Sequence, residues 1–173
     1  MQGCCIILLC IASAVVYGIV QDQITARVCV EYFTIGHPPI FRTNDPTLLG
    51  LGWGVIATWW VGLLLGIPLA VAARLGNQPK ISLAALLKPI ALLMAAVGIG
   101  ALIAGIIGWL LASQGIVVLL EPLAGRVPPE KHVAFLADLW AHLASYFIGF
   151  VGGVVVMVWV WRSRGKARVP SAL

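Results

Sequence analysis

Charged side chains are scarce in this sequence. Only 10% of its 173 residues are Asp, Glu, Lys or Arg, whereas 61% are hydrophobic. Soluble domains carry about 25% charged residues, and the mean hydropathy here is +1.04. This scarcity excludes an ordinary soluble domain and predicts an integral membrane protein, whose first partner is the lipid bilayer.

Cysteine is rare as well, and its distribution does not suggest a disulfide framework. Cys4, Cys5 and Cys10 fall within the first apolar run, and only Cys29 lies beyond it. A metal site made of the first three would need thiolates inside lipid. We therefore interpret these cysteines as small apolar side chains.

The motifs of many enzyme classes are missing. The sequence contains no phosphate-binding loop, dinucleotide fingerprint, EF-hand loop, paired-Cys motif or His-Glu-x-x-His. Cys29 lies near Glu31 and His37, and Ser145 lies three residues after His142, but no Gly-x-Ser-x-Gly elbow frames Cys29 or Ser145. An intramembrane hydrolase is thus a weaker alternative to a protein that is not an enzyme.

The few basic residues gather on one side of the apolar runs, and the formal net charge is +5. Seven lie on that side and four on the other: Arg74, Lys80, Lys88, Arg162, Arg164, Lys166 and Arg168 against Arg27, Arg42, Arg126 and Lys131. This is the positive-inside bias, which places both ends of the chain in the cytoplasm. The charge therefore orients the protein and does not indicate a nucleic-acid partner.

Four apolar runs are long enough to cross a hydrocarbon core of about 30 Å. The expected spans are 4–20, 49–74, 89–112 and 133–161, with outer loops at 21–48 and 113–132 and a basic tail at 162–173. They predict an all-α, four-helix transmembrane bundle that forms a single domain over 1–173, with a polar outer loop between the first two helices.

The first run has a second interpretation. Ala12, Ser13 and Ala14 would supply the small residues of a signal-peptide cleavage site. No Lys or Arg precedes the run, however, and we favour a retained span.

Local signals mark several helix ends. Asp45 and Pro46 form a helix start in which the carboxylate caps and proline loses no bonded amide, and Ser82 can cap the third helix. Pro68 should kink the second helix. Between the first two spans, Arg27 and Glu31 have the spacing of a helical ion pair, but 28–35 is rich in strand formers, so helix and strand both remain open.

Small residues recur at helical spacing within the last three spans. Such stripes let membrane helices approach closely and associate through packing. The packing residues we expect are Gly54, Gly62 and Gly66 in the second span, Gly100 and Gly108 in the third, and Gly149 and Gly153 in the fourth. They predict a compact bundle.

One set of titratable residues stands out. Asp138 and His142 are four residues apart and share a helix face, while Glu31 and His37 belong to the loop that would cover the same outer end. Two carboxylates and two imidazoles suit zinc or iron, with His132 as an extra ligand, or they could pass a proton. The alternatives are plain solvation at the interface, or an ion pair with Arg27 or Arg42.

Part of the chain resembles a known group. The segments Tyr17, 21–27 and 31–39, continuing into Gly52-Trp53-Gly54, resemble a group of small, uncharacterised bacterial multi-pass membrane proteins over about the first 75 residues. The resemblance implies the bacterial cytoplasmic (inner) membrane. It implies no activity and no residue roles.

Three roles follow from these observations. The first is a structural or assembly partner of other membrane components, either a second membrane protein or another copy of this chain. The second is a metal-binding or proton-handling site at the outer face, formed by Glu31, His37, Asp138 and His142. The third is a small transporter or channel subunit that acts as an oligomer.

Overall fold

The computed structural model describes residues 1–166, and the part of the tail after 166 lies outside the described residues. The described chain is helical: α1 (Gln2–Val28), α2 (Glu31–Thr34), α3 (Pro46–Ile56), α4 (Trp59–Arg74), α5 (Leu83–Ser113), a 3-10 turn η1 (Pro129–Lys131) and α6 (His132–Lys166). Four stretches are long and apolar enough to cross a membrane, namely Gln2–Val28, Pro46–Arg74, Leu83–Ser113 and Pro129–Gly165. The predicted all-helical fold, with four stretches that could span a membrane, is confirmed.

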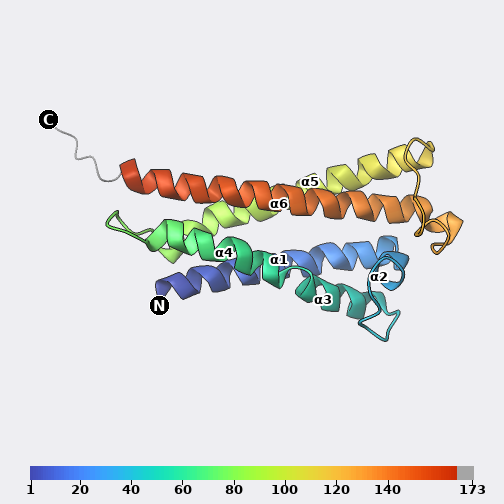
Figure 1. Cartoon of the computed structure of the whole chain (residues 1–173), viewed down its shortest axis with the longest axis horizontal. Coiled ribbons are helices and arrows are strands. Elements are labelled where there is room, and N and C mark those ends of the chain that lie inside the picture. Colours follow the sequence, from blue (N-terminus) through green and yellow to red (C-terminus); the bar gives the residue numbers. More distant parts are fainter. Residues whose placement is uncertain (167–173) are drawn as a thin grey trace.

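The helices form two antiparallel pairs that lie side by side (Figure 1). One pair consists of α1 packed along α3 and α4, and the other of α5 packed along α6. The pairs meet where α4 contacts α6 and where α1 contacts α5, whereas α1 and α6 lie diagonally opposite and touch little. The centre of the bundle therefore lies between α1 and α6 along one diagonal and is also bordered by α4 and α5.

Large apolar side chains cover the outside of the bundle. Leu64, Leu102, Phe147 and Val155 are each more than half exposed, as are many similar residues on every long helix. In water such a surface would be unfavourable, whereas in a bilayer it faces lipid tails that are equally apolar. The exposed surface is that of a multi-pass membrane protein.

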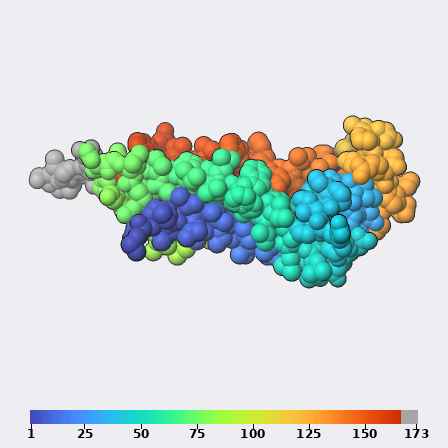
Figure 2. Space-filling view, turned by 60° about the horizontal axis from the view of Figure 1, so that its bottom comes forward, coloured from blue at the N-terminus to red at the C-terminus, as the bar shows by residue number. Residues whose placement is uncertain are grey.

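Two hydrophobic clusters close the bundle at its ends. At the end formed by residues 29–45 and 114–131, which we call the cap end, the cluster includes Cys29, Phe33, Trp53 and Phe135. At the opposite end, which holds the N-terminus, the α4–α5 turn and the end of α6 and which we call the basic end, Ile6, Leu69, Leu86 and Val160 pack together. Figure 2 shows the resulting rod, with the two capping segments at one tip.

The helix starts follow the local signals. The Asp45 carboxylate accepts a hydrogen bond from the Leu48 amide at 2.9 Å, with Pro46 next in the chain, and Ser82 Oγ accepts from the Ala85 amide at 3.4 Å. In contrast, α1 continues eight residues past the expected end at 20, to Val28. Apolarity ends at Val20, but backbone hydrogen bonding does not, because nothing at 21–28 breaks a helix.

The segment after α1 is partly helical. The backbone at Cys29 is extended and ends α1, and the turn α2 (Glu31–Thr34) follows. Arg27 does not pair with Glu31 but donates to Gln23 and Thr47. The helix alternative is therefore correct for 31–34, but α1 does not continue into this turn.

The second span is interrupted near its middle. Its helix breaks at Ala57 and Thr58, between α3 and α4, whereas α4 continues through Pro68. The Thr58 hydroxyl donates to the Gly54 carbonyl. An irregular backbone at membrane depth is tolerated where it lines a cavity, and this break does so.

The glycines expected at helix contacts occupy different surroundings. A Cβ on Gly54 or Gly62 would lie within 2.6 Å of the α1 backbone at Ile19 or Ile11, so backbones meet there. Gly66, Gly100, Gly108 and Gly153 face the side chains of Cys10, Ile148, Trp140 and Leu65, respectively. A Cβ on Gly149 would meet only Val97 at 3.9 Å, an ordinary contact, because Gly149 faces a cavity.

Candidate functional site

A cavity of about 140 Å³ lies between the four long helices, between the two hydrophobic clusters. Its half toward the basic end is lined mainly by apolar side chains: Leu65, Leu69, Ile90, Leu93, Met94, Val97 and Val156. Its half toward the cap end is lined by polar and aromatic ones: Tyr17, Gln21, Asp22, Tyr32, Phe33, His37, Thr58, His142, Ser145 and Tyr146. The cavity is therefore amphipathic along the bundle axis.

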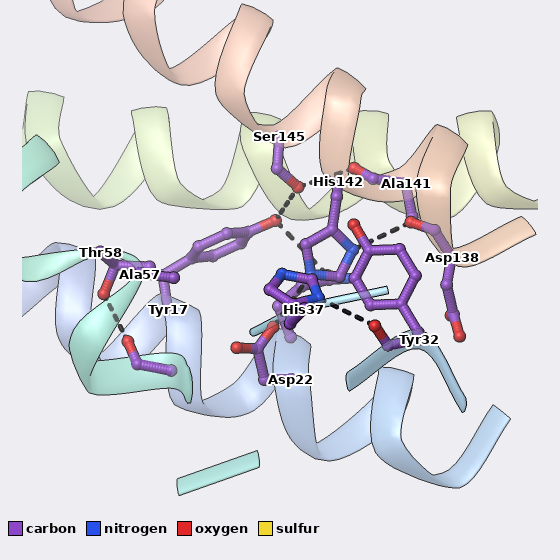
Figure 3. A network of polar contacts seen from close by, with 12 residues as sticks. Tyr17, Asp22, Tyr32, His37, Ala57, Thr58, Asp138, Ala141, His142 and Ser145 are labelled. Carbon is purple, nitrogen blue, oxygen red and sulfur yellow. Dashed lines mark hydrogen bonds and ion pairs between the residues drawn. The ribbon is translucent and has the colours of Figure 1, made fainter. Parts of the chain in front are cut away.

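The central contact of the polar half joins α1 to α6. The Nε2 atom of His142 lies 3.0 Å from Oδ1 of Asp22, whose residue is 4% exposed. The other ring nitrogen, Nδ1, lies 2.9 Å from the backbone oxygen of Asp138 (Figure 3). Both nitrogens of His142 thus have partners.

These contacts fix where protons must lie. A carbonyl oxygen only accepts, so Nδ1 of His142 carries a hydrogen. The Nε2–Oδ1 contact needs a second proton, which belongs either to the imidazolium or to a protonated Asp22 carboxyl. The pair has no net charge in either form, which suits an interior of low dielectric constant.

A second polar contact lies one turn closer to the basic end. Ser145 Oγ donates to the Ala141 carbonyl at 2.9 Å and lies 2.7 Å from the Tyr17 hydroxyl, which also lies 3.4 Å from Oε1 of Gln21. The Tyr146 hydroxyl of α6 donates to the Ala57 carbonyl at the α3–α4 break, at 3.4 Å. Hydroxyls therefore continue the polar lining beyond the Asp22–His142 pair.

Aromatic rings seal the polar half toward the cap end. The Tyr32 ring lies with its centroid 4.6 Å from that of His142 and 5.0 Å from that of His37, and the His37 ring lies 4.6 Å from Trp53. The Nδ1 atom of His37 contacts the Tyr32 carbonyl at 2.8 Å. Burial lowers the pKa of His37 below its usual 6.5, and burial, with Asp138 as a smaller contributor, raises the pKa of the Tyr32 phenol. Both side chains are therefore uncharged at neutral pH.

Asp138 lies beside this network, but its carboxyl points away from the His142 ring (Figure 3). The residue is 5% exposed, and its Oδ2 atom has no hydrogen-bond partner. Asp138 contacts His142 only through its backbone carbonyl oxygen.

Glu31 faces Cys29, whose thiol donates a hydrogen bond to the Glu31 carboxylate at 3.4 Å. Burial, followed by this hydrogen bond to Glu31, raises the pKa of Cys29 to about 12, so Cys29 is not a thiolate nucleophile at neutral pH.

Of the four residues predicted from the sequence, the structure brings two into one network. His37 and His142 both contact Tyr32, while Asp138 and Glu31 direct their carboxyls elsewhere. Among residues 1–166, no three His, Cys, Asp or Glu side chains are grouped as metal ligands, and the zinc or iron site stays a prediction.

The site residues predicted from the sequence do not include three residues of this polar network, Asp22, Tyr17 and Tyr32. The sequence assigns Asp22 to a loop, because the apolar run stops two residues before it. One signal was available, since Asp22, Thr25 and Cys29 recur at helical spacing and lie buried on one face of the extended α1 and the turn after it.

A groove on the outside of the bundle adjoins the cavity. It lies between α1 and α5 and is lined by Ala12, Ser13, Val16, Tyr17, Val20 and Met94. Ser13, Tyr17 and Met94 line both the groove and the cavity. The cavity therefore approaches the lipid-facing surface at these three residues, whereas its two ends are closed.

Comparison with protein-family models, with curated proteins and with solved structures found no match for the chain. The function is accordingly inferred from the geometry of the cavity and its polar residues.

Proposed function

We propose that the protein is a multi-pass protein of the bacterial cytoplasmic membrane that binds a small lipid-soluble molecule in its central cavity. The polar end of the molecule lies beside Asp22 and His142, and both chain ends face the cytoplasm. The observation that carries the proposal is the amphipathic cavity, apolar along one half and ending at a buried His–Asp pair in the other. Apolar pockets with a few convergent polar groups are the usual form of ligand sites.

The route into the cavity supports a ligand that comes from lipid. Tyr32 and Phe33 are less than 10% exposed and cover the cap end, and the cluster around Leu86 covers the basic end. Ser13, Tyr17 and Met94 line both the cavity and the outer groove between α1 and α5. A molecule dissolved in the bilayer can reach the cavity there.

The orientation and location rest on two further observations. Basic residues without acidic ones occupy the basic end, as the positive-inside rule requires of a cytoplasmic face. The resemblance of the first 75 residues to bacterial membrane proteins supports the membrane. The roles of assembly partner and of oligomeric transporter or channel subunit stay predictions.

The experiment uses a photoreactive lipid-soluble probe. The purified full chain in liposomes is irradiated with a diazirine-bearing hexadecanol, and the labelled peptides are mapped by mass spectrometry. We expect labels at the cavity residues of Ser13–Asp22 and His142–Gly149, in addition to lipid-facing positions. Labels confined to lipid-facing positions would overturn the proposal.

A cavity-filling variant supplies the specificity test. In Gly149→Leu the Cβ has room, and the rest of the side chain enters the cavity, so cavity labelling should fall to background. Gly3→Leu is the matched control, because it makes the same change in a helix where nothing lies within 4 Å of the new Cβ. Circular dichroism and size-exclusion chromatography establish that both variants fold. Unchanged cavity labelling in Gly149→Leu would contradict binding inside the bundle.

A further inference from the structure

The charge of the cavity lining restricts the head group of the ligand. The lining contains one acid, Asp22, and no Lys or Arg. A carboxylate or phosphate head would meet the Asp22 oxygens without a free cation to bind it, since His142 is already hydrogen-bonded to Asp22. The acid available to an ammonium head would be Asp22, which is already paired with His142. The head group is therefore uncharged.

The hydrogen-bonding groups restrict it further. Both protons of the Asp22–His142 pair are already in hydrogen bonds, one to the Asp138 carbonyl and one between Nε2 and Oδ1 of Asp22, which leaves Oδ2 to accept from a ligand. The Tyr17 hydroxyl contacts Ser145 and Gln21, and its oxygen retains a lone pair that can accept. A ligand hydroxyl could therefore donate to Asp22 or to Tyr17. The site suits a head that carries hydroxyl groups.

Shape is the third restriction. A cavity of about 140 Å³ is close to the roughly 150 Å³ of an engineered cavity that accommodates benzene. Tyr32, Phe33 and His37 present flat rings at its polar half, and rings pack well by offset or edge-to-face contact. A single flat ring fits, whereas a long tail needs other space. The apolar groove at Ala12, Val16 and Val20 offers that space toward the bilayer.

We infer that the ligand is an isoprenoid quinol, whose uncharged ring lies beside Asp22, His142 and Tyr17 and whose hydrocarbon tail leaves between α1 and α5. This inference rests on the proposed function and adds the chemical class of the ligand. It concerns binding alone. The ring hydroxyls donate hydrogen bonds at the polar half, and the tail replaces a lipid chain in the groove.

Competition against the diazirine-bearing hexadecanol tests the ligand class. Decylubiquinol, decan-1-ol and decanoate are added to the liposomes at matched membrane concentrations, and loss of cavity labelling is measured. The second ring hydroxyl supplies one hydrogen bond more than decan-1-ol can make, which corresponds to about tenfold in affinity, so decylubiquinol should compete at concentrations at least about tenfold below those of decan-1-ol. Decanoate should be the weakest competitor because of its charge.

The double variant Asp22→Leu/His142→Leu is the matched control for the head group. It removes both polar partners together, and decylubiquinol should then lose its advantage over decan-1-ol. Equal competition in the wild-type protein, or an advantage retained in the double variant, would overturn the quinol inference and leave the proposed function intact if the probe still labels the cavity. Absence of cavity labelling would overturn both.

The position of the tail has its own test. A Cβ on Gly98 of α5 would meet only Tyr17, at 3.7 Å, so Gly98→Leu should narrow the passage between α1 and α5. We expect weaker competition by decylubiquinol and unchanged competition by the tailless 2,3-dimethoxy-5-methylhydroquinone. An equal effect on both compounds, or on neither, would contradict an exit between these helices.

Discussion

His142 and Asp22 join two helices that otherwise touch little. The imidazole of α6 and the carboxyl of α1 meet at 3.0 Å across the diagonal of the bundle. Among residues 1–166, each of these side chains has the other as its only side-chain hydrogen-bond partner. The two residues therefore depend on each other, and this dependence can be measured.

The first prediction is that losing one member of the pair costs more than losing both. Asp22→Leu or His142→Leu leaves a buried polar group unpaired, at about 1–3 kcal/mol each. The double variant leaves none, so its loss of stability should be clearly smaller than the sum. Thermal unfolding in detergent, followed by circular dichroism, measures the three variants. Additive losses would show that the pair is not coupled.

The second prediction separates two glycines that look alike in sequence. Gly54→Ala places a Cβ 2.5 Å from the Ile19 Cα, so α1 must shift, at about 1–3 kcal/mol. Gly149→Ala meets Val97 at 3.9 Å, and the helix gains about 0.5–1 kcal/mol from replacing glycine. The unfolding midpoint should fall in the first variant and stay level or rise in the second. Equal midpoints would contradict the close contact of α1 with α3.

Arg164 provides the third prediction. Its guanidinium is fully buried and donates to the carbonyls of Ala72, Leu75, Gln78 and Pro79, which end α4 and form the following turn. Hydrogen bonds from charged groups contribute about 1.5–3 kcal/mol each.

Arg164→Ala should therefore lower stability by about 3 kcal/mol, and Arg164→Lys should recover only part of the loss, since an ammonium lacks the planar fork. The control is Arg162→Ala, because Arg162 is exposed two residues away. Thermal unfolding of the three variants gives the comparison. Similar losses for Arg162→Ala and Arg164→Ala would assign the effect to charge alone.

The fourth prediction concerns pH. Burial lowers the pKa of His37 below 6.5 in the folded protein, so the unfolded chain binds the proton more readily. This contribution leaves stability unchanged above pH 6.5 and reduces it as the pH falls below 6.5, until His37 is protonated in the folded state as well. His37→Gln should flatten the decline of the unfolding midpoint between pH 6.5 and 5. The same decline in both proteins would place its origin in other groups.

The sequence by itself determines those features of this protein that depend on residues close together in the chain. The four spans follow from apolar length, and the starts of α3 and α5 follow from Asp45 with Pro46 and from Ser82, because a cap depends on residues within one turn. His142 was also identified as a functional candidate, since a titratable residue inside a span is costly and needs a partner.

The tertiary structure alone decided which partner His142 has. Asp22 is 120 residues away, and its position opposite His142 depends on how far α1 extends beyond its apolar run and on the register between α1 and α6. The Arg164 contacts with the α4–α5 turn are equally remote in sequence. Spacing along one helix determines which residues share a face, but the residue that a face meets is determined by the packing of all the helices together.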